Sequence, residues 1–113
     1  MSPKFAPFGA GAGIIATAGI AAIDPATMTP RFADFDAQAR WVLNQLDEVL
    51  HYAGTNRDNI LRLECFLADR CWFGAWNTCF AEHFGPQAPA RTTLVCGLPV
   101  DGLLIELQAT ATL

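Results

Sequence analysis

The amino-acid sequence predicts an α+β fold, an α/β sandwich in which two helices cover one face of a mixed β-sheet. Two segments carry apolar residues at helical spacing, and several others alternate apolar and polar residues as half-buried strands do. The predicted order is strand, a second short strand, helix, strand, helix, strand and strand. Elements in this order pack as two layers around one core, so we expect a single domain over residues 1–113.

The predicted sheet begins in the apolar segment 8–23, where residues 14–20 have the composition of a strand. Glycines at positions 9, 11, 13 and 19 indicate two short strands, or a strand with a bulge, closely approached by another part of the chain. The segment is too short to span a membrane and only Lys4 supplies a charge before it, so we expect neither a targeting sequence nor membrane association. Asp24-Pro25-Ala26-Thr27 then has turn composition.

The clearest helix is predicted from about residue 34 to residue 53. Its apolar residues recur at the spacing of an amphipathic helix: Phe35, Ala39, Val42, Leu43, Leu46, Val49, Leu50 and Ala53. Asp34 or Asp36 is suited to cap its start, and Gly54 to end it in a left-handed conformation.

A strand and a second helix are predicted next. Residues 60–67 alternate in character and read as a strand. Asp69 is suited to cap the following helix, and Gly85-Pro86 to end it. One face of that helix carries Phe73, Trp76, Asn77, Phe80 and Phe84.

Two final strands each contain one charged residue that bears on function. Arg91 lies in the segment 89–95, and Glu106 lies in the segment 103–113, whose odd positions are all apolar. A turn at residues 98–102, which contain Asp-Gly, predicts that the two strands form a hairpin. A guanidinium grips a carboxylate with two parallel hydrogen bonds, so Arg91 beside Glu106 predicts a pocket for a small carboxylic acid with an acid/base group.

Composition limits the class of protein. Of 113 residues, 52% are hydrophobic and 16% charged, which is apolar for a small soluble chain and predicts an oligomer. The net charge of −4 and the scattered basic residues argue against nucleic-acid binding. Cys65, Cys71, Cys79 and Cys96 lack metal-site spacing, so we expect no metal; we expect Cys65, Cys79 and Cys96 to be buried free thiols in a reducing, cytoplasmic setting.

Blocks of residues along nearly the whole chain resemble the Rid (YjgF-type) family of enamine/imine deaminases. These blocks are Thr17-Ala18-Gly19, Asp24-Pro25, Ala37-Gln38-Ala39-Arg40, Leu46-Asp47-Glu48-Val49-Leu50, Phe66-Leu67-Ala68-Asp69, Trp76-Asn77 and, as the most specific, Pro89-Ala90-Arg91-Thr92-Thr93 with Ile105-Glu106. The resemblance implies a chorismate-mutase-like fold and a homotrimer with its sheets around a central barrel and its active sites in clefts between subunits.

The resemblance also implies an activity, the hydrolysis of reactive 2-imino or 2-enamino acids to 2-keto acids and ammonium without a cofactor. Arg91 then corresponds to the arginine that binds the substrate carboxylate, and Glu106 to the glutamate that positions or activates water. Gly19, Thr93 and Asn77 correspond to residues that line the substrate pocket.

Two departures from the family pattern affect the predicted pocket. Ala18 replaces a serine before Gly19, and Pro7-Phe8 is the nearest match to a Pro-Tyr whose tyrosine lies in the cleft, so Phe8 is the predicted substrate-binding residue there. Two hydroxyl groups are therefore missing, and an aromatic or larger imino acid becomes a candidate substrate.

Other interpretations of the same residues stay open. Arg91 and Glu106 could be solvated strand residues or a simple ion pair. The three tryptophans could contribute to packing or to a subunit interface rather than bind a ligand; they are Trp41, Trp72 and Trp76. The chain could be a sensor that binds small 2-keto acids without turnover. It could be a deaminase dedicated to a larger amino-dienoate, or have the chaperone-like or nuclease activity attributed to relatives.

Overall fold

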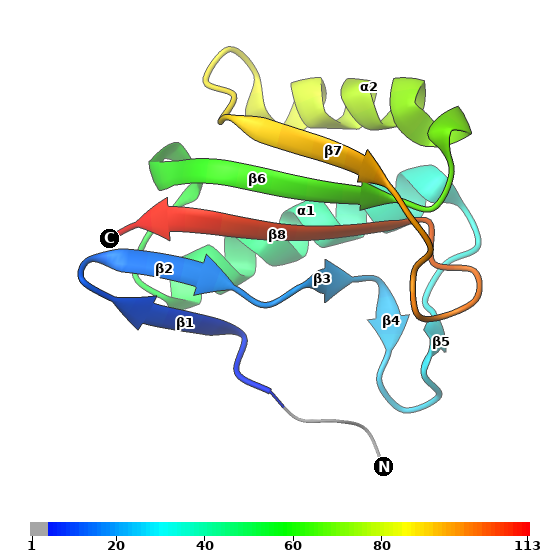
Figure 1. The fold of residues 1–113 in the computed structure, drawn as a ribbon, viewed down its shortest axis with the longest axis horizontal. Coiled ribbons are helices and arrows are strands. Elements are labelled where there is room, and N and C mark those ends of the chain that lie inside the picture. Colours follow the sequence, from blue (N-terminus) through cyan, green and yellow to red (C-terminus); the bar gives the residue numbers. More distant parts are fainter. Residues whose placement is uncertain (1–4) are drawn as a thin grey trace.

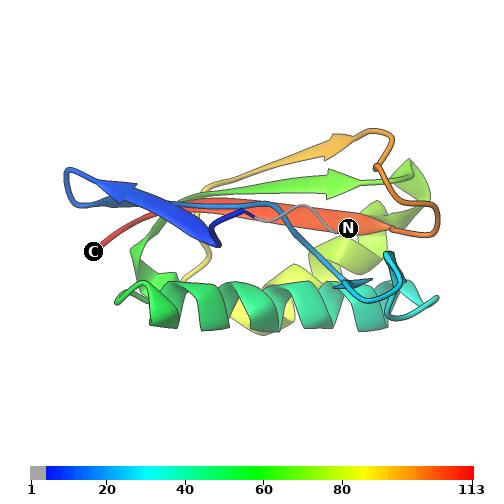
Figure 2. The ribbon, with the colours of Figure 1, turned by 90° about the horizontal axis from the view of Figure 1, so that it is seen from below.

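The computed structural model describes residues 5–113, and it has the predicted two layers, with both helices on one face of a mixed sheet (Figures 1 and 2). The sheet order is β1 (Phe8–Gly11), β2 (Ile14–Thr17), β8 (Ile105–Thr112), β6 (Ile60–Leu67) and β7 (Arg91–Val95), and β3 (Ile20–Ala21) also pairs with β8. A separate ribbon contains β4 (Ile23–Asp24) and β5 (Thr29–Pro30). The helices are α1 (Phe35–Tyr52) and α2 (Phe73–Phe84), and single 3₁₀ turns form η1 (Arg57–Asn59) and η2 (Arg70–Trp72).

Helix α1 begins and ends where its capping residues predict. The Asp34 carboxylate accepts a hydrogen bond of 2.9 Å from the Ala37 amide, and Gly54 has a φ of +91° directly after the helix. Its apolar stripe is buried against the sheet, including Val42, Leu46 and Leu50. Asp69 instead caps η2 through the Cys71 amide at 2.8 Å, so the predicted cap of α2 lies one short turn before that helix.

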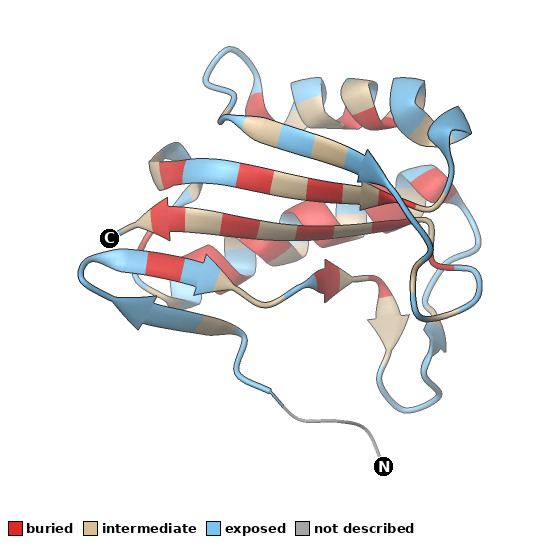
Figure 3. Cartoon of the chain, viewed as in Figure 1, coloured by how far each residue is buried: buried red, intermediate tan, exposed pale blue. Residues whose placement is uncertain are grey.

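Strand β8 lies at the centre of the sheet and alternates as predicted (Figure 3). Ile105, Leu107, Ala109 and Ala111 are buried, whereas the residues between them are half-buried. The apolar side chains form the core with those of α1 and β6. Glu106 therefore lies on the face of the sheet that the helices leave uncovered.

The N-terminal segment forms two short strands, one of the two arrangements predicted. β1 and β2 pair through a tight turn at Ala12 and Gly13, which both have positive φ, as a two-residue hairpin requires. The predicted strand over residues 14–20 is interrupted after Thr17, and its end forms β3. The intervening Ala18-Gly19 leaves the sheet, although Thr17 Oγ1 still accepts a hydrogen bond of 3.0 Å from the Ala109 amide of β8.

The predicted hairpin of the last two strands is wrong. β7 and β8 both pair with β6, which lies between them, in parallel to β7 and antiparallel to β8. A turn does form at the predicted place, where the Leu103 amide donates to the Val100 carbonyl at 3.2 Å. The chain uses it to cross the end of β6 (Figure 1). A turn signal is local, whereas strand pairing depends on residues far apart in the sequence.

The cysteines divide into two classes. Cys65 and Cys79 are buried free thiols, as predicted, whereas Cys71 and Cys96 are exposed. The prediction for Cys96 is wrong because β7 ends at Val95, so the thiol lies in the crossing loop. Within residues 5–113, no helix is long and apolar enough to cross a membrane, and no cluster of three His, Cys, Asp or Glu side chains is arranged to hold a metal ion.

Candidate functional site

Arg91 is the first residue of β7, and its side chain reaches helix α2. Aromatic rings and one side-chain amide of that helix contact its guanidinium. Its Nη2 donates a hydrogen bond to the Asn77 side-chain oxygen. Its Cζ lies 4.6 Å from the ring centroid of Phe80, 5.8 Å from Phe73 and 5.9 Å from Trp76. Aromatic faces stabilise a guanidinium while leaving its N–H groups available to an anion. Arg91 and Asn77, both predicted as site residues, are therefore in direct contact.

Thr93 lies on the same face of β7 as Arg91, two residues farther along the strand. Thr93 Oγ1 and Trp76 Nε1 are both buried without a hydrogen-bond partner among residues 5–113. They lie near the Cys65 thiol, whose pKa burial raises to about 11, so that thiol stays protonated and unreactive at neutral pH.

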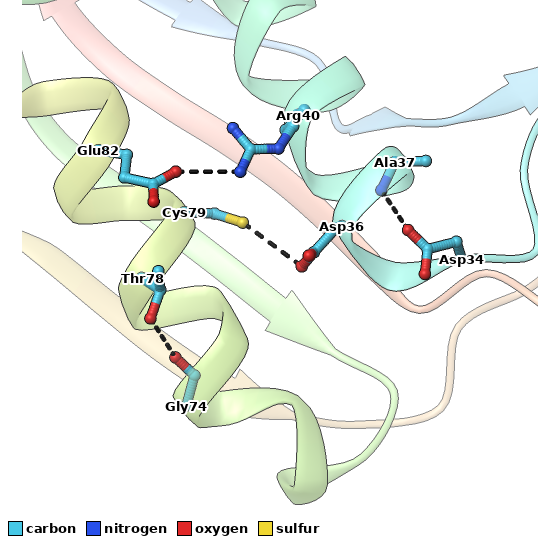
Figure 4. Close-up of polar contacts among 8 residues, drawn as sticks. All are labelled: Asp34, Asp36, Ala37, Arg40, Gly74, Thr78, Cys79 and Glu82. Atoms are coloured by element: carbon cyan, nitrogen blue, oxygen red, sulfur yellow. Dashed lines mark hydrogen bonds and ion pairs between the residues drawn. The ribbon is translucent and has the colours of Figure 1, made fainter.

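Polar contacts between the helices fix α2, and with it Asn77, against α1 (Figure 4). Arg40 Nη2 lies 3.0 Å from Glu82 Oε2, an exposed pair that contributes little by itself. The Cys79 thiol donates to Asp36 Oδ1 at 3.8 Å, and burial together with that carboxylate raises the pKa of the thiol. Cys79 thus acts as a neutral donor inside the helix interface.

Glu106 lies against Gly19 in a second cluster, where β8 pairs with β3. A Cβ atom on Gly19 would lie 2.3 Å from Glu106 Oε2 and 3.2 Å from its Cδ, so only glycine leaves the carboxylate in its place. Burial raises the pKa of Glu106. A cleft of about 500 Å³ opens beside this carboxylate, and its walls include Phe5, Gly19, Arg31, Trp41, Pro99 and Glu106.

The two clusters lie on opposite faces of the sheet. Arg91 pairs with Leu63 of β6, whereas Glu106 pairs with Phe66, three residues farther along the same strand. Side chains alternate between faces, so an odd offset puts Arg91 and Glu106 on different faces. They are also two strands apart, roughly 10 Å. The predicted pocket shared by Arg91 and Glu106 is therefore wrong within one chain, and none of the ion pairs within residues 5–113 includes either residue.

Phe8 lies away from the Glu106 cleft. Its ring packs edge-on against Tyr52 at the end of α1, with 6.0 Å between centroids. Phe5, three residues earlier in the sequence, lines the cleft instead. The hairpin between β1 and β2 fixes this register, because it pairs Phe8 with Thr17.

Arg31 and Trp41 are cleft residues for which sequence reasoning had assigned no ligand role. Arg31 follows β5, and its Cζ lies 4.9 Å from the centroid of the Trp41 ring on α1. Periodicity predicts only that Trp41 lies on a helix. Its contact with Arg31 depends on how the β4–β5 ribbon folds over that helix.

The chain matches, over residues 7–113, the family described as endoribonuclease L-PSP. A RutC family protein from Synechocystis is 38% identical over 104 residues, which cover 89% of this chain and 79% of that protein. A RutC family protein from Pyrococcus horikoshii is 36% identical over 95 residues, covering 83% of this chain and 75% of that protein. A solved structure from Yersinia pestis, of a Rid family protein of unknown function, is 30% identical, with a TM-score of 0.86 over 96% of this chain and 87% of that chain.

Proposed function

The chain belongs to the endoribonuclease L-PSP family, which includes Rid and RutC proteins, and on this basis we propose that it hydrolyses reactive 2-imino and 2-enamino acids to 2-keto acids and ammonium. The observation that carries the proposal is the half-buried Glu106 carboxylate, held against Gly19 in an open cleft. The exposed Cys71 and Cys96 thiols suit a reducing compartment, and we infer that the protein acts in the cytoplasm.

The reaction needs little from the protein beyond orientation and proton transfer. Arg91 binds the substrate carboxylate, and Glu106 accepts a hydrogen bond from a water molecule beside the C=N carbon. Water adds to the protonated imine and gives a tetrahedral amino alcohol. The C–N bond then breaks, so that one water is consumed and one ammonium leaves with the keto acid. The raised pKa of Glu106 makes its carboxylate a better proton acceptor.

We further propose that copies of this chain complete the site for one another in a homotrimer. Arg91 lies at the β7 edge and Glu106 on the other face beside β3, so one chain presents two incomplete halves. An interface that brings the β7 edge of one copy to the Glu106 cleft of the next would bring both groups to one substrate. The exposed Leu94 and Val95 of β7, each 52% exposed, favour such an interface.

A trapping assay tests the activity. An amino acid oxidase generates 2-imino acids in place, semicarbazide competes for them, and loss of semicarbazone reports hydrolysis. We expect Arg91→Ala to lose at least about tenfold in rate, the cost of one charge-assisted contact, with the fold retained. Arg62→Ala, which removes an exposed arginine of β6, is the matched control for charge. Activity retained in Arg91→Ala would remove that residue from the mechanism.

Two alternative functions can be tested beside the proposed one. A sensor of 2-keto acids would bind them without accelerating any imine, as the missing serine and tyrosine hydroxyls would favour. The family description names an endoribonuclease, but the net charge of −4 and the pairing of Arg40 and Arg57 with carboxylates weigh against RNA binding. An RNA titration at low salt tests that alternative.

A further inference from the structure

The Glu106 cleft contains a cation, Arg31, that the proposed reaction does not use. Arg31 follows the β4–β5 ribbon, and its backbone amide donates to the Ala22 carbonyl at 2.8 Å. Its guanidinium lies over the Trp41 ring, and no carboxylate among residues 5–113 forms an ion pair with it. Arg40 and Arg57, in contrast, each pair with a carboxylate.

Hydrogen bonds within the turn between β4 and β5 fix the loop that precedes Arg31. The Asp24 carboxylate accepts a hydrogen bond of 2.9 Å from the Ala26 amide, and the Asp24 carbonyl accepts one of 2.8 Å from Met28. Met28 has a φ of +56°, a left-handed conformation that is costly for a residue with a side chain. Backbone strain of this kind persists where the surrounding contacts enforce it. Met28 and Arg31 both reach the cleft from this loop.

The rest of the cleft is mostly apolar. Ala21, Ile23, Met28 and Pro99 line it beside Trp41. Its volume of about 500 Å³ is in the range of sites for small organic ligands and exceeds the needs of a three-carbon imino acid. Arg31 is itself exposed at this cleft, and its stacking on Trp41 leaves the N–H groups of the guanidinium available to an anion.

We propose that Arg31, held on Trp41, forms a distal anion subsite that selects 2-imino acids carrying a second carboxylate at the far end of an apolar chain. This inference rests on the proposed function, since it places Glu106 at the reacting end of the substrate. Glu106 and Arg31 belong to one chain and one cleft, while Arg91 of another copy would bind the first carboxylate. The guanidinium edge can bind a carboxylate through two N–H groups, which an ammonium cannot do in the same plane.

The test compares two substrates that differ only in the distal group. A glutamate oxidase generates 2-iminoglutarate, and an amino acid oxidase generates the imine of norvaline, in which a methyl group replaces the second carboxylate. Hydrolysis of each is measured in wild type, Arg31→Met, Arg31→Lys and the surface control Arg62→Met. Thermal melting confirms that each variant is folded.

We expect Arg31→Met to lower kcat/KM for 2-iminoglutarate by roughly tenfold or more, the loss expected from one charge-assisted contact. The norvaline imine should be unaffected, and Arg31→Lys should recover only part of the loss because it lacks the planar guanidinium. Arg62→Met should behave as wild type. Equal effects of Arg31→Met on both substrates, or no effect on either, would overturn the subsite.

A binding measurement separates this inference from the proposed function. Calorimetric titration of wild type and Arg31→Met with 2-oxoglutarate and with 2-oxopentanoate needs no turnover. If wild type hydrolyses neither imine but binds 2-oxoglutarate through Arg31, the activity is wrong and the subsite holds. If wild type hydrolyses both imines and 2-oxoglutarate binds both proteins equally, the activity holds and the subsite is wrong.

Discussion

Glycine at position 19 determines where the Glu106 carboxylate lies. A Cβ atom there would contact Oε2 at 2.3 Å, yet that oxygen is the far end of a flexible side chain. The carboxylate can therefore turn away at a small cost in stability, although it can no longer occupy the same place in the cleft. Position 19 thus separates an effect on catalysis from an effect on folding.

We expect Gly19→Ala to lower kcat for imine hydrolysis by roughly tenfold to a hundredfold, because it displaces the group that orients water. The melting temperature should change by only a few degrees, as for a substitution of less than about 1 kcal/mol. Gly74→Ala is the matched control, since a Cβ there meets nothing within 4 Å. Full activity in Gly19→Ala would show that the position of the Glu106 carboxylate is not critical.

The residues that form the cleft were only partly predictable. Gly19 and Glu106 follow from the family motifs, and the structure places them in contact. Phe5 and Arg31 are missed because neither lies in a motif. Their places depend on the hairpin register and on the fold of the β4–β5 ribbon, which are set by contacts between distant parts of the chain.

At the scale of elements, one buried side chain joins two loops to helix α1. The Gln38 amide donates hydrogen bonds of 2.9 Å to the Phe32 and Gly102 carbonyls and accepts one of 2.9 Å from the Leu104 amide. It therefore joins α1 to the loop before it and to the start of β8, two residues from Glu106. These three hydrogen bonds explain, in structural terms, why a glutamine stands at position 38 in the block Ala37-Gln38-Ala39-Arg40.

We expect Gln38→Leu to lower the free energy of unfolding by about 2–4 kcal/mol, because three backbone groups lose part-buried hydrogen bonds at once. Thr78→Val is the control, since Thr78 Oγ1 makes one exposed bond of 3.3 Å to the Gly74 carbonyl and its loss should cost less than about 1 kcal/mol. Urea unfolding at one fixed protein concentration measures both. Equal losses in the two variants would contradict the role assigned to Gln38.

Elements with a strong local signal were predicted nearly to the residue. The periodic segment 34–53 became α1 with Asp34 as its cap, and the alternating segment 60–67 became β6. The β7–β8 hairpin was wrong, although the turn at residues 98–102 forms. β6 pairs in parallel with β7, to which α2 connects it, so β8 pairs with the other edge of β6. The residues of a single strand do not indicate which strand it will pair with.

At the scale of the whole molecule, the apolar composition and the divided site have one explanation. Large apolar side chains remain exposed on a single chain, including Leu61, Phe73, Leu94 and Val95. Two of these lie on β7, the edge strand that also carries Arg91. Unpaired edge strands with apolar side chains are prone to associate. A second copy at this edge would cover them and supply the missing half of the site.

A shared cleft can be tested by mixing two impaired variants. Arg91→Ala lacks the carboxylate clamp and Glu106→Gln lacks the proton acceptor, so each alone should retain at most about a tenth of the wild-type rate. If every cleft takes Arg91 from one subunit and Glu106 from its neighbour, random co-assembly of equal amounts gives about a quarter of clefts with both native residues. We therefore expect about a quarter of wild-type activity in the trapping assay after co-refolding. Co-refolding Arg91→Ala with the double variant creates no native cleft, so its activity should not exceed that of Arg91→Ala alone. If the first mixture also shows no gain in activity, Arg91 and Glu106 do not meet across an interface.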